Sequence, residues 1–484
     1  MTKKNIAKSL KENIEIFQKT LDYVSDLRIR ILKIGSKPYI DGAILYIDGI
    51  ADTEKIQEYL VVPLLSLNSA NDDEAFIDEI AYRHIKTADV DVVESFQPLI
   101  DGVLLGKAVI LLDHNTKGIV TETAQWKERI VAEAVNERAY RGPLIGCTEK
   151  LKTNLNLIRS LVKTPKLCIR SMKVGILSKT DVSIVYIRDI ATEKNVTEVM
   201  NRIQRINVKY LLEARIIEDY IEGKRKTFFP LSLSTERPDS IGAALYDGRI
   251  AILVDGTPEA ILVPTVFWQF FQFPDDYYGK FGRFITRPLR FLCFLTTIYL
   301  PGLYTAIMRF HKDVLPANDL KSSLLAHTLI PIWAEVLILL ILLHIINDAS
   351  FRLPKSTVFS LSILGTIIVG DAALSSKFVH PLSLFIVGVC FITGYPLVNR
   401  GFLSAVIALR FLLFFIGGFL GLSCLGIVSL LLIIYAASLK SLGVPYLAPL
   451  IPFHPNEWKD TFYRGNLDDI TNSPHTFPSK ENKE

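Results

Sequence analysis

The stretch GFLSAVIALRFLLFFIGGFLGLSCLGIVSLLLIIYAASL, residues 401–439, decides the class of this protein. It contains a single formally charged side chain, Arg410. A helix needs only about 20 apolar residues to cross a hydrocarbon core about 30 Å thick. A helix on the surface of a water-soluble protein keeps one polar face, which this stretch lacks. The C-terminal part of the chain is therefore predicted to lie in a membrane.

Apolar blocks extend this stretch to residues 288–440, which we interpret as an all-α, multi-pass membrane domain. About six transmembrane helices are predicted, at residues 288–308, 329–347, 356–374, 379–397, 402–418 and 420–439. Gly417 and Gly418 permit a tight turn between the last two. Lys and Arg are modestly more frequent before the first span and after the second, fourth and sixth, which predicts that both termini are cytoplasmic.

The remaining composition argues against several classes of protein. A net charge of +4 on 484 residues gives no argument for nucleic-acid binding, which favours a concentrated basic face. The five cysteines form no CxxC pair and are interpreted as structural, with no metal and no cofactor. No phosphate loop, HExxH, GxSxG or dinucleotide motif occurs, so the protein is not expected to be an enzyme. The N-terminus lacks the apolar region of a signal peptide, which agrees with a cytoplasmic N-terminal region.

Stretches of the N-terminal part repeat one another. AILYIDGIADTEKI, from Ala43, resembles SIVYIRDIATEKNV, from Ser183. GKAVILLD, from Gly106, resembles GRIAILVD, from Gly248, in the same order and at nearly the same offset. The first pair has the alternation of a strand followed by a turn and a charged helical segment. A duplicated α/β region that is soluble is therefore predicted before the membrane domain.

Three features of the N-terminal part and of the segment before the first span are interpreted as structural. Asp113 and Asp255, which end the second pair of matching stretches, are interpreted as turn residues rather than functional ones. A basic amphipathic helix between the halves is interpreted as a link packed between them, or alternatively as a contact with a membrane or partner. The aromatic and basic segment before the first span is expected to lie along the membrane interface, the alternative being core aromatics of the second half.

The predicted parts of the chain are an N-terminal helical arm (1–36), a first α/β subdomain (37–136), a linking helix (137–172), a second α/β subdomain (173–266), an interfacial segment (267–287), the membrane domain (288–440) and a cytoplasmic tail (441–484).

Ionisable side chains inside the predicted spans are the candidate functional residues, because charge in a bilayer is costly and usually serves a function. They are Glu335 and His344 in the second span, Asp371 in the third and Arg410 in the fifth. One interpretation is that they line an ion path. The other is an internal ion pair between Arg410 and one of the two carboxylates, and the sequence leaves both open.

Long motifs of the chain resemble the GerA family of spore germination proteins, the A-type subunits of nutrient germinant receptors. The longest, GRIAILVDGTPEAILVPTVFWQFFQFPDDYY, covers residues 248–278. Shorter motifs on both sides of it match the family in the same order: RGPLIGCTEKLKTNLNLIR (141–159), TERPD (235–239), FRLPK (351–355), IALRFL (407–412) and SLGVPYLAPLIPF (441–453). The chain departs from the family pattern where Leu340 and His344 replace acidic residues, and where Asp371 replaces a usual Gln.

The resemblance implies a multi-pass protein of the bacterial cell membrane, which in spores is the inner spore membrane. The partners it implies are a B-type transporter-like subunit, a C-type lipoprotein subunit, further copies in a homo-oligomer and membrane lipid, with no nucleic acid. The implied function is to couple nutrient sensing to germination, as an ion channel or signalling component. A membrane transporter with a cytoplasmic regulatory domain and a non-conducting scaffold for germination proteins are the alternatives.

Overall fold

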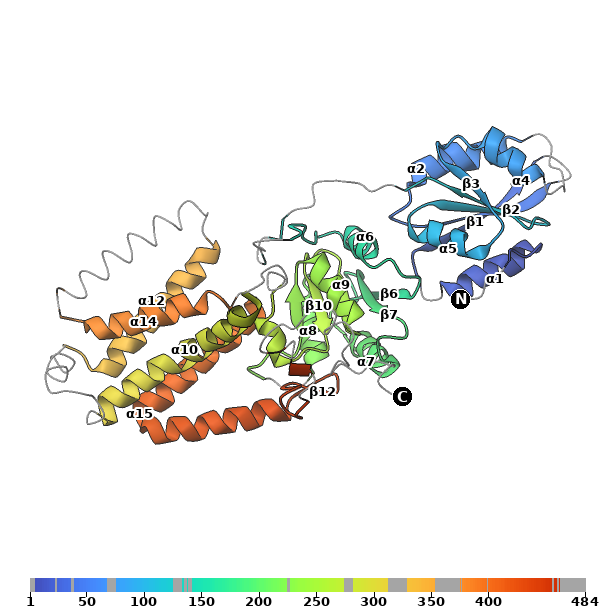
Figure 1. The fold of residues 1–484 in the computed structure, drawn as a ribbon. Helices are drawn as coiled ribbons and strands as arrows, with labels where there is room; N and C mark the ends of the chain where they lie inside the picture. The colour runs from blue at the N-terminus through green and yellow to red at the C-terminus, as the bar shows by residue number, and fades with distance from the viewer. Residues whose placement is uncertain are drawn as a thin grey trace. The chain divides into compact units, whose positions relative to one another are not determined.

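Two five-stranded sheets of the same strand order form the N-terminal part of the protein in a computed structural model (Figure 1). The structure describes residues 5–21, 24–35, 39–67, 75–124, 133–134, 137, 142–223, 227–273, 282–311, 329–352, 375, 377–397, 399–454, 457–458 and 461. The chain divides into two compact units, of which unit 1 is residues 1–224 and 234–264 with the C-terminal end, and unit 2 is residues 225–233 and 265–476.

The first sheet has the order β1-β2-β4-β5-β3 and the second the order β6-β7-β9-β10-β8. The strands of the first sheet are β1 (Leu27–Ile34), β2 (Ile40–Ile47), β3 (Val90–Val93), β4 (Ala108–Leu112) and β5 (Gly118–Thr121). Those of the second are β6 (Leu167–Val174), β7 (Thr180–Ile187), β8 (Leu233–Thr235), β9 (Ile250–Val254) and β10 (Ala260–Val263). The identical order confirms the predicted duplication.

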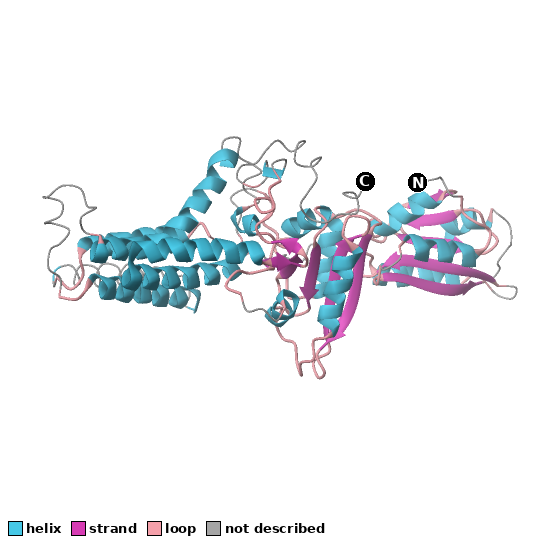
Figure 2. Ribbon diagram, turned by 90° about the horizontal axis from the view of Figure 1, so that it is seen from below, coloured by secondary structure: helices cyan, strands magenta, loops and turns pink. Residues whose placement is uncertain are grey.

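Helices cover the first sheet on both faces, because its buried residues alternate between two cores. Ile44 of β2 belongs to one core and Leu45 to the other. The helical segments that contribute to the first core are η1 (Ile56–Val61), α3 (Val62–Leu65), α4 (Phe76–Glu79) and η2 (Ile80–His84). The short helix α2 (Thr53–Lys55) precedes η1 and is exposed. Those of the other core are α1 (Leu10–Thr20) and α5 (Phe96–Leu104). The result is a layered α/β subdomain (Figure 2).

The second subdomain repeats this plan with α6 (Leu151–Leu161), α7 (Glu193–Gln204), α8 (Arg215–Glu222) and α9 (Pro238–Tyr246). Asp113 Oδ1 accepts a hydrogen bond from the Leu10 amide at 2.8 Å, and Asp255 Oδ1 accepts one from the Leu151 amide at 3.1 Å. The repeated aspartates therefore cap α1 and α6 in the two halves. Since α6 holds the place of α1, it is an element of the repeat as well as a link; the residue limits of the predicted parts stay predictions.

Contacts within unit 1 join α6 to the first half. Arg159 binds the carboxylate of Asp26 through Nε and Nη2, both at 2.7 Å, and Asn156 Nδ2 donates to the carbonyl of Gly49 at 2.7 Å. The Ser25 amide donates to the carbonyl of Ile169 on the edge strand β6 at 3.4 Å. These contacts agree with a helix packed between the halves.

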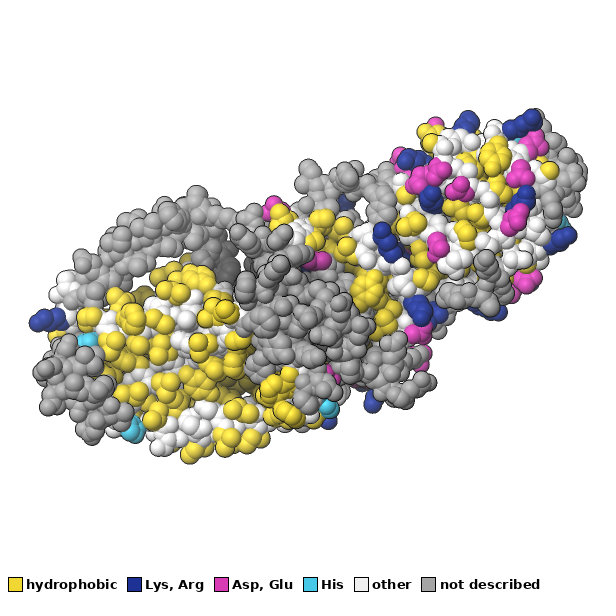
Figure 3. Space-filling model, in the orientation of Figure 1, with side chains coloured by type: hydrophobic (Ala, Val, Ile, Leu, Met, Phe, Trp, Pro, Cys, Tyr) yellow, Lys and Arg dark blue, Asp and Glu magenta, His cyan; other side chains and the backbone are white. Residues whose placement is uncertain are grey.

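Unit 2 is helical and presents mainly apolar side chains, whereas charged side chains are spread over unit 1 (Figure 3). Its elements are η3 (Phe267–Phe271), α10 (Gly282–Phe310), α12 (Ile332–Arg352), α14 (Pro381–Gly394), α15 (Arg400–Ser438), β11 (Lys440–Ser441) and β12 (Val444–Pro445). Among the described residues, three segments are long and apolar enough to cross a membrane: Ile285–Phe310, Ile332–Ala349 and Gly401–Ser438. The third predicted span, 356–374, lies outside the described residues, so the count of six stays a prediction.

The predicted turn at Gly417 and Gly418 is displaced to Gly421, where φ is 82° and ψ is −173°. This left-handed φ suits glycine, and the two arms of α15 fold back from it (Figure 1). Gly417 stays helical, and it lies at a close contact between α15 and α10. A Cβ atom placed on it would lie 2.3 Å from the carbonyl oxygen of Gly302 on α10, so the two helix backbones touch there.

Candidate functional site

A buried carboxylate lies where three helices of unit 2 meet. Glu335, in the first turn of α12, is fully buried. Its Oε2 accepts hydrogen bonds from the His380 amide and from the Ser383 hydroxyl, each at 3.0 Å. The Tyr304 hydroxyl of α10 lies 3.0 Å from Ser383 Oγ. Because the Ser383 proton is directed to Glu335, Tyr304 donates to Ser383, and we name these four residues the Glu335 cluster.

Among the described residues, the hydrogen-bond partners of this carboxylate are a backbone amide at a helix N-terminus and a hydroxyl group. His380 is the N-cap of α14, and its Nδ1 accepts from the Leu382 amide at 3.1 Å. Unpaired amides and the positive end of the helix dipole at such a terminus stabilise a negative charge. Glu335 Oε1 has no hydrogen-bond partner among the described residues, so one buried oxygen remains available to a water molecule or ion.

Arg410 lies on the first arm of α15 and is only 5% exposed. Within the described part of the chain it forms no ion pair with Glu335, and its Nε has no hydrogen-bond partner. A pair with Asp371 cannot be placed, because that residue lies outside the described residues and the pair stays a prediction. His344, on α12, is exposed on the surface of unit 2. Among the residues that the structure describes, no hydrogen bond or ion pair joins any two of the four predicted residues.

Aromatic side chains join the segments that enter and leave the helices of unit 2. The aromatic collar comprises Phe267, Trp268, Phe270, Phe271, Phe402 and Tyr446, all of them 7% exposed or less. The rings of Phe270 and Phe402 stack at 4.8 Å, and those of Phe267 and Tyr446 lie 5.9 Å apart. Ser441 Oγ donates to the Leu231 carbonyl at 2.6 Å and accepts from the Thr265 amide at 3.0 Å. Both ends of α15 are thus tied to the segment before α10.

The sequence shows the aromatic density of this collar but not its packing. The side chains of η3, which were expected to lie along the membrane interface, contact α10 and α15 in a protein core. Their burial follows from the long-range return of the chain at Tyr446, which no local pattern reveals. Where the segment sits in a membrane stays a prediction.

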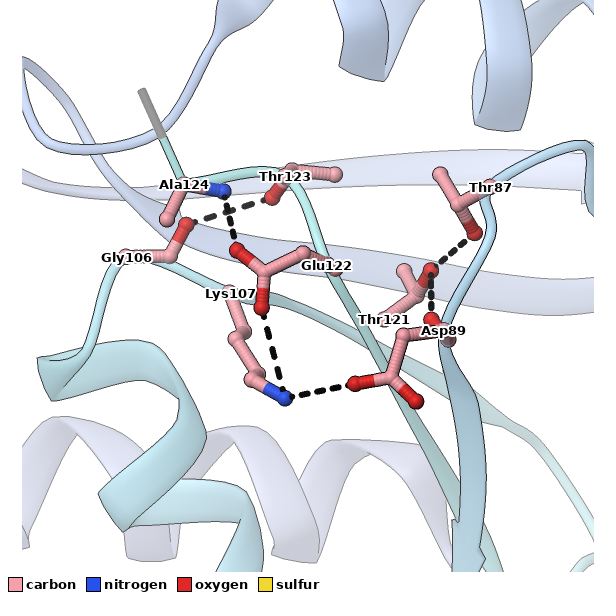
Figure 4. A network of polar contacts seen from close by, with 8 residues as sticks. All are labelled: Thr87, Asp89, Gly106, Lys107, Thr121, Glu122, Thr123 and Ala124. Atoms are coloured by element: carbon pink, nitrogen blue, oxygen red, sulfur yellow. Dashed lines mark hydrogen bonds and ion pairs between the residues drawn. The ribbon is translucent and has the colours of Figure 1, made fainter. Parts of the chain in front are cut away.

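A charged cluster in unit 1 is a second candidate site (Figure 4). Lys107 Nζ lies 3.1 Å from Asp89 Oδ2 and 3.4 Å from Glu122 Oε2. The hydrogen bond to Asp89 raises the pKa of Lys107, which keeps it protonated and unsuited to act as a base or nucleophile. The hydroxyl of Thr121 also donates to the Asp89 carbonyl, at 3.1 Å. The cluster therefore joins the segment before β3 to the start of β4 and the end of β5.

A further polar cluster in unit 1 surrounds Glu137. Its carboxylate contacts the Thr235 hydroxyl at 2.5 Å, and its carbonyl accepts from Arg237 Nη1 at 3.2 Å. Arg237 is 1% exposed, pairs with Asp239 at 2.8 Å and donates to the Pro143 carbonyl at 3.0 Å. Burial raises the pKa of Glu137 from 4.5 to about 7. The segment before α6 is therefore attached to the second subdomain through a carboxyl group that titrates near neutral pH.

Raising the pH from about 4.5 to 7 should destabilise unit 1 through Glu137. The folded state holds this proton more tightly than the unfolded state, so the stabilisation is complete below 4.5 and is lost as pH rises through about 7. The change should reach about 3 kcal/mol at most. Thermal unfolding of the full chain across this range, compared with Glu137→Gln, measures it. The Gln variant should flatten the profile, and an unchanged profile would contradict the assignment.

Comparison with known proteins places the chain beside spore germination proteins. A family model described as Bacillus/Clostridium GerA spore germination protein matches residues 15–476. The chain is 33% identical over 464 residues to spore germination protein KA of Bacillus subtilis (strain 168), covering 95% of this chain and 85% of that protein. It is 31% identical over 465 residues to spore germination protein GerLA of Bacillus cereus, covering 94% and 93%. A crystal structure of the N-terminal domain of the A subunit of the Bacillus megaterium spore germinant receptor GerK3 is 32% identical, with a TM-score of 0.43, over 55% of this chain and 99% of that one.

Proposed function

This chain belongs to the GerA family of spore germination proteins, and from that membership we propose that it acts as the A subunit of an endospore germinant receptor. It couples nutrient sensing to germination as a component of an oligomeric ion channel or signalling assembly. It resides in the inner spore membrane with both termini on the core side. Its partners are a B-type transporter-like subunit, a C-type lipoprotein subunit, membrane lipid and further copies of itself.

The observation that carries the ion-conducting role is the Glu335 cluster. Glu335 is a fully buried carboxylate with one oxygen unpartnered among the described residues, and burying such a group costs free energy. A protein keeps a group of this kind where it serves a function or where a water molecule or cation binds the free oxygen. The cluster draws on α10, α12 and α14, so a small shift of any of these helices changes its geometry. In the proposal, Glu335 with His344 and Asp371 forms the ion path, and Arg410 supplies the opposing charge.

The aromatic collar supports a route for the signal. It ties the start of α15, the end of α15 and the segment before α10 into one packed core. A rearrangement of the segment at Leu231 or Thr265 would be transmitted to the ends of the helices through Ser441. A packed core of this kind favours two discrete arrangements over continuous deformation.

Spores that carry Glu335→Gln should release monovalent cations about tenfold more slowly after germinant addition, because a neutral amide loses the charge-assisted hydrogen bonds of the carboxylate. Ion release is measured beside the amount of the protein in the spore membrane. Glu79→Gln, a 43%-exposed carboxylate in unit 1, is the matched control and should release ions normally. Normal release by the Glu335 variant at normal protein level would reject the ion path and favour a non-conducting scaffold.

A further inference from the structure

Apolar side chains are exposed at the tip of the β6–β7 hairpin in the second subdomain. Ile176 and Leu177, in the turn between the strands, are 61% and 75% exposed. Tyr210 and Leu212, in the loop before α8, are 58% and 72% exposed. Exposed apolar side chains that gather in one place usually mark an interaction surface, and we name these four residues the apolar tip.

Hydrogen bonds hold the two segments of the apolar tip together. The amides of Ile176 and Leu177 donate to the carbonyls of Val208 and Lys209 at 3.0 and 2.8 Å. On the other side of the turn, the Leu211 amide donates to Ser178 Oγ at 3.0 Å. The patch is therefore preformed, and little conformational entropy is lost when it binds.

The duplication supplies a comparison for this turn. In the sequence, Ser36 and Lys37 of the first half align with Ile176 and Leu177 of the second, at the same offset that aligns β1 with β6. β1 pairs with β2 in the same register as β6 pairs with β7, so this strand pairing is compatible with polar residues at the two aligned sequence positions. The apolar residues of the second half serve something other than folding of the turn.

The charges around the apolar tip are mainly basic. Exposed charged residues in the hairpin and in the adjoining loop are Lys173, Lys179, Arg205 and Lys209 against Asp181 and Glu213. Asp181 already pairs with Lys173 at 3.8 Å. An apolar centre with a basic rim suits the interface of a bilayer that contains anionic lipids.

We propose that the apolar tip inserts into the headgroup region of an anionic membrane. The second subdomain is covalently joined at residues 233–234 and 264–265 to unit 2, whose described helices include segments long and apolar enough to cross a membrane. Tethering of this kind raises the effective concentration of the surface and makes a small patch sufficient. The proposal goes beyond the receptor function and does not depend on ion conduction.

A spin label at Leu177→Cys in the full-length protein tests the insertion. The protein is reconstituted in nanodiscs with anionic lipid, and collisions of the label with oxygen and with a water-soluble nickel complex are compared. Signal from the five native cysteines is removed by subtracting the parent protein labelled in the same way. Tyr82→Cys, at a 71%-exposed position of the first subdomain, is the water-exposed control. We expect several-fold less nickel access at Leu177 than at Tyr82, with oxygen access retained.

A second variant isolates the apolar side chains. Ile176→Ser with Leu177→Lys gives the second hairpin the residues of the first, and a label at Tyr210→Cys in this background should regain access to nickel. Equal nickel access at Leu177 and Tyr82 in anionic nanodiscs would overturn the proposal. Protection of Leu177 from both nickel and oxygen would also overturn it, because protein rather than lipid would then cover the apolar tip.

Discussion

Gly417→Leu should prevent the helices of unit 2 from packing and deplete the folded protein from the membrane. A Cβ atom at this position would lie 2.3 Å from the carbonyl oxygen of Gly302, and one on Gly302 would lie 2.6 Å from the carbonyl of Leu413. Backbone atoms block the space on both sides, so no side-chain rotation relieves the overlap. Helix contacts in membranes depend on such close approach of small residues. Overpacking costs about 1–3 kcal/mol, and here at least about 3 kcal/mol because backbone must move.

Gly426→Leu is the control for this substitution. Gly426 lies on the second arm of α15, where no described atom lies within 4 Å of the position that a Cβ atom would take, and leucine is a good helix former there. The amount of protein in the membrane fraction and its Tm in detergent should fall for Gly417→Leu and stay normal for Gly426→Leu. Equal levels of the two variants would show that α10 and α15 do not meet at these glycines.

The repeated subdomain and the apolar helices were predictable because both leave local patterns. Period-two alternation around Ile44 and Ile184 identifies strands, and runs without charge identify helices that can span a bilayer. The match of two segments about 140 residues apart showed the duplication. That α1 and α6 belong to the repeat was harder to see, since the aspartates that cap them lie about 100 residues away along the chain.

The geometry around the candidate residues was not predictable, since it depends on which helices meet. The sequence left open whether Glu335 lines an ion path or pairs with Arg410, and it did not reveal its described partners, which are a helix N-terminus and the Ser383 hydroxyl. The sequence around His380 and Pro381 does carry the signal of a helix start. That signal does not say which carboxylate approaches it. The predicted position of the α15 kink was wrong for a similar reason, because neighbouring glycines in the stretch are locally equivalent and only the contact with Gly302 separates them.

Arg159→Ala should separate the two halves of unit 1 and cost about 3 kcal/mol, because it leaves a carboxylate without its buried partner. The Arg159 and Asp26 side chains are only 3% and 16% exposed, and two hydrogen bonds of 2.7 Å join them. Arg159→Lys should recover part of the loss, because an ammonium group keeps the charge but not the two-pronged geometry. Unfolding of the full chain by urea, with each variant, measures these differences.

The double variant with Asp26→Ala decides whether the pair acts as a unit. Removing both partners leaves no unpaired charge, so the double variant should be more stable than the sum of the single losses predicts. Arg83→Ala, in a pair whose side chains are 75% and 43% exposed, should cost less than about 1 kcal/mol and show little coupling to Glu79. If Arg159→Ala behaves like this surface control, the halves are held by the backbone contact at Ile169 and by Asn156 rather than by the buried charge. A large coupling energy between Arg159 and Asp26 instead means that this ion pair fixes the arrangement of the two repeats. A conformational change that moves one repeat against the other would then have to break the ion pair.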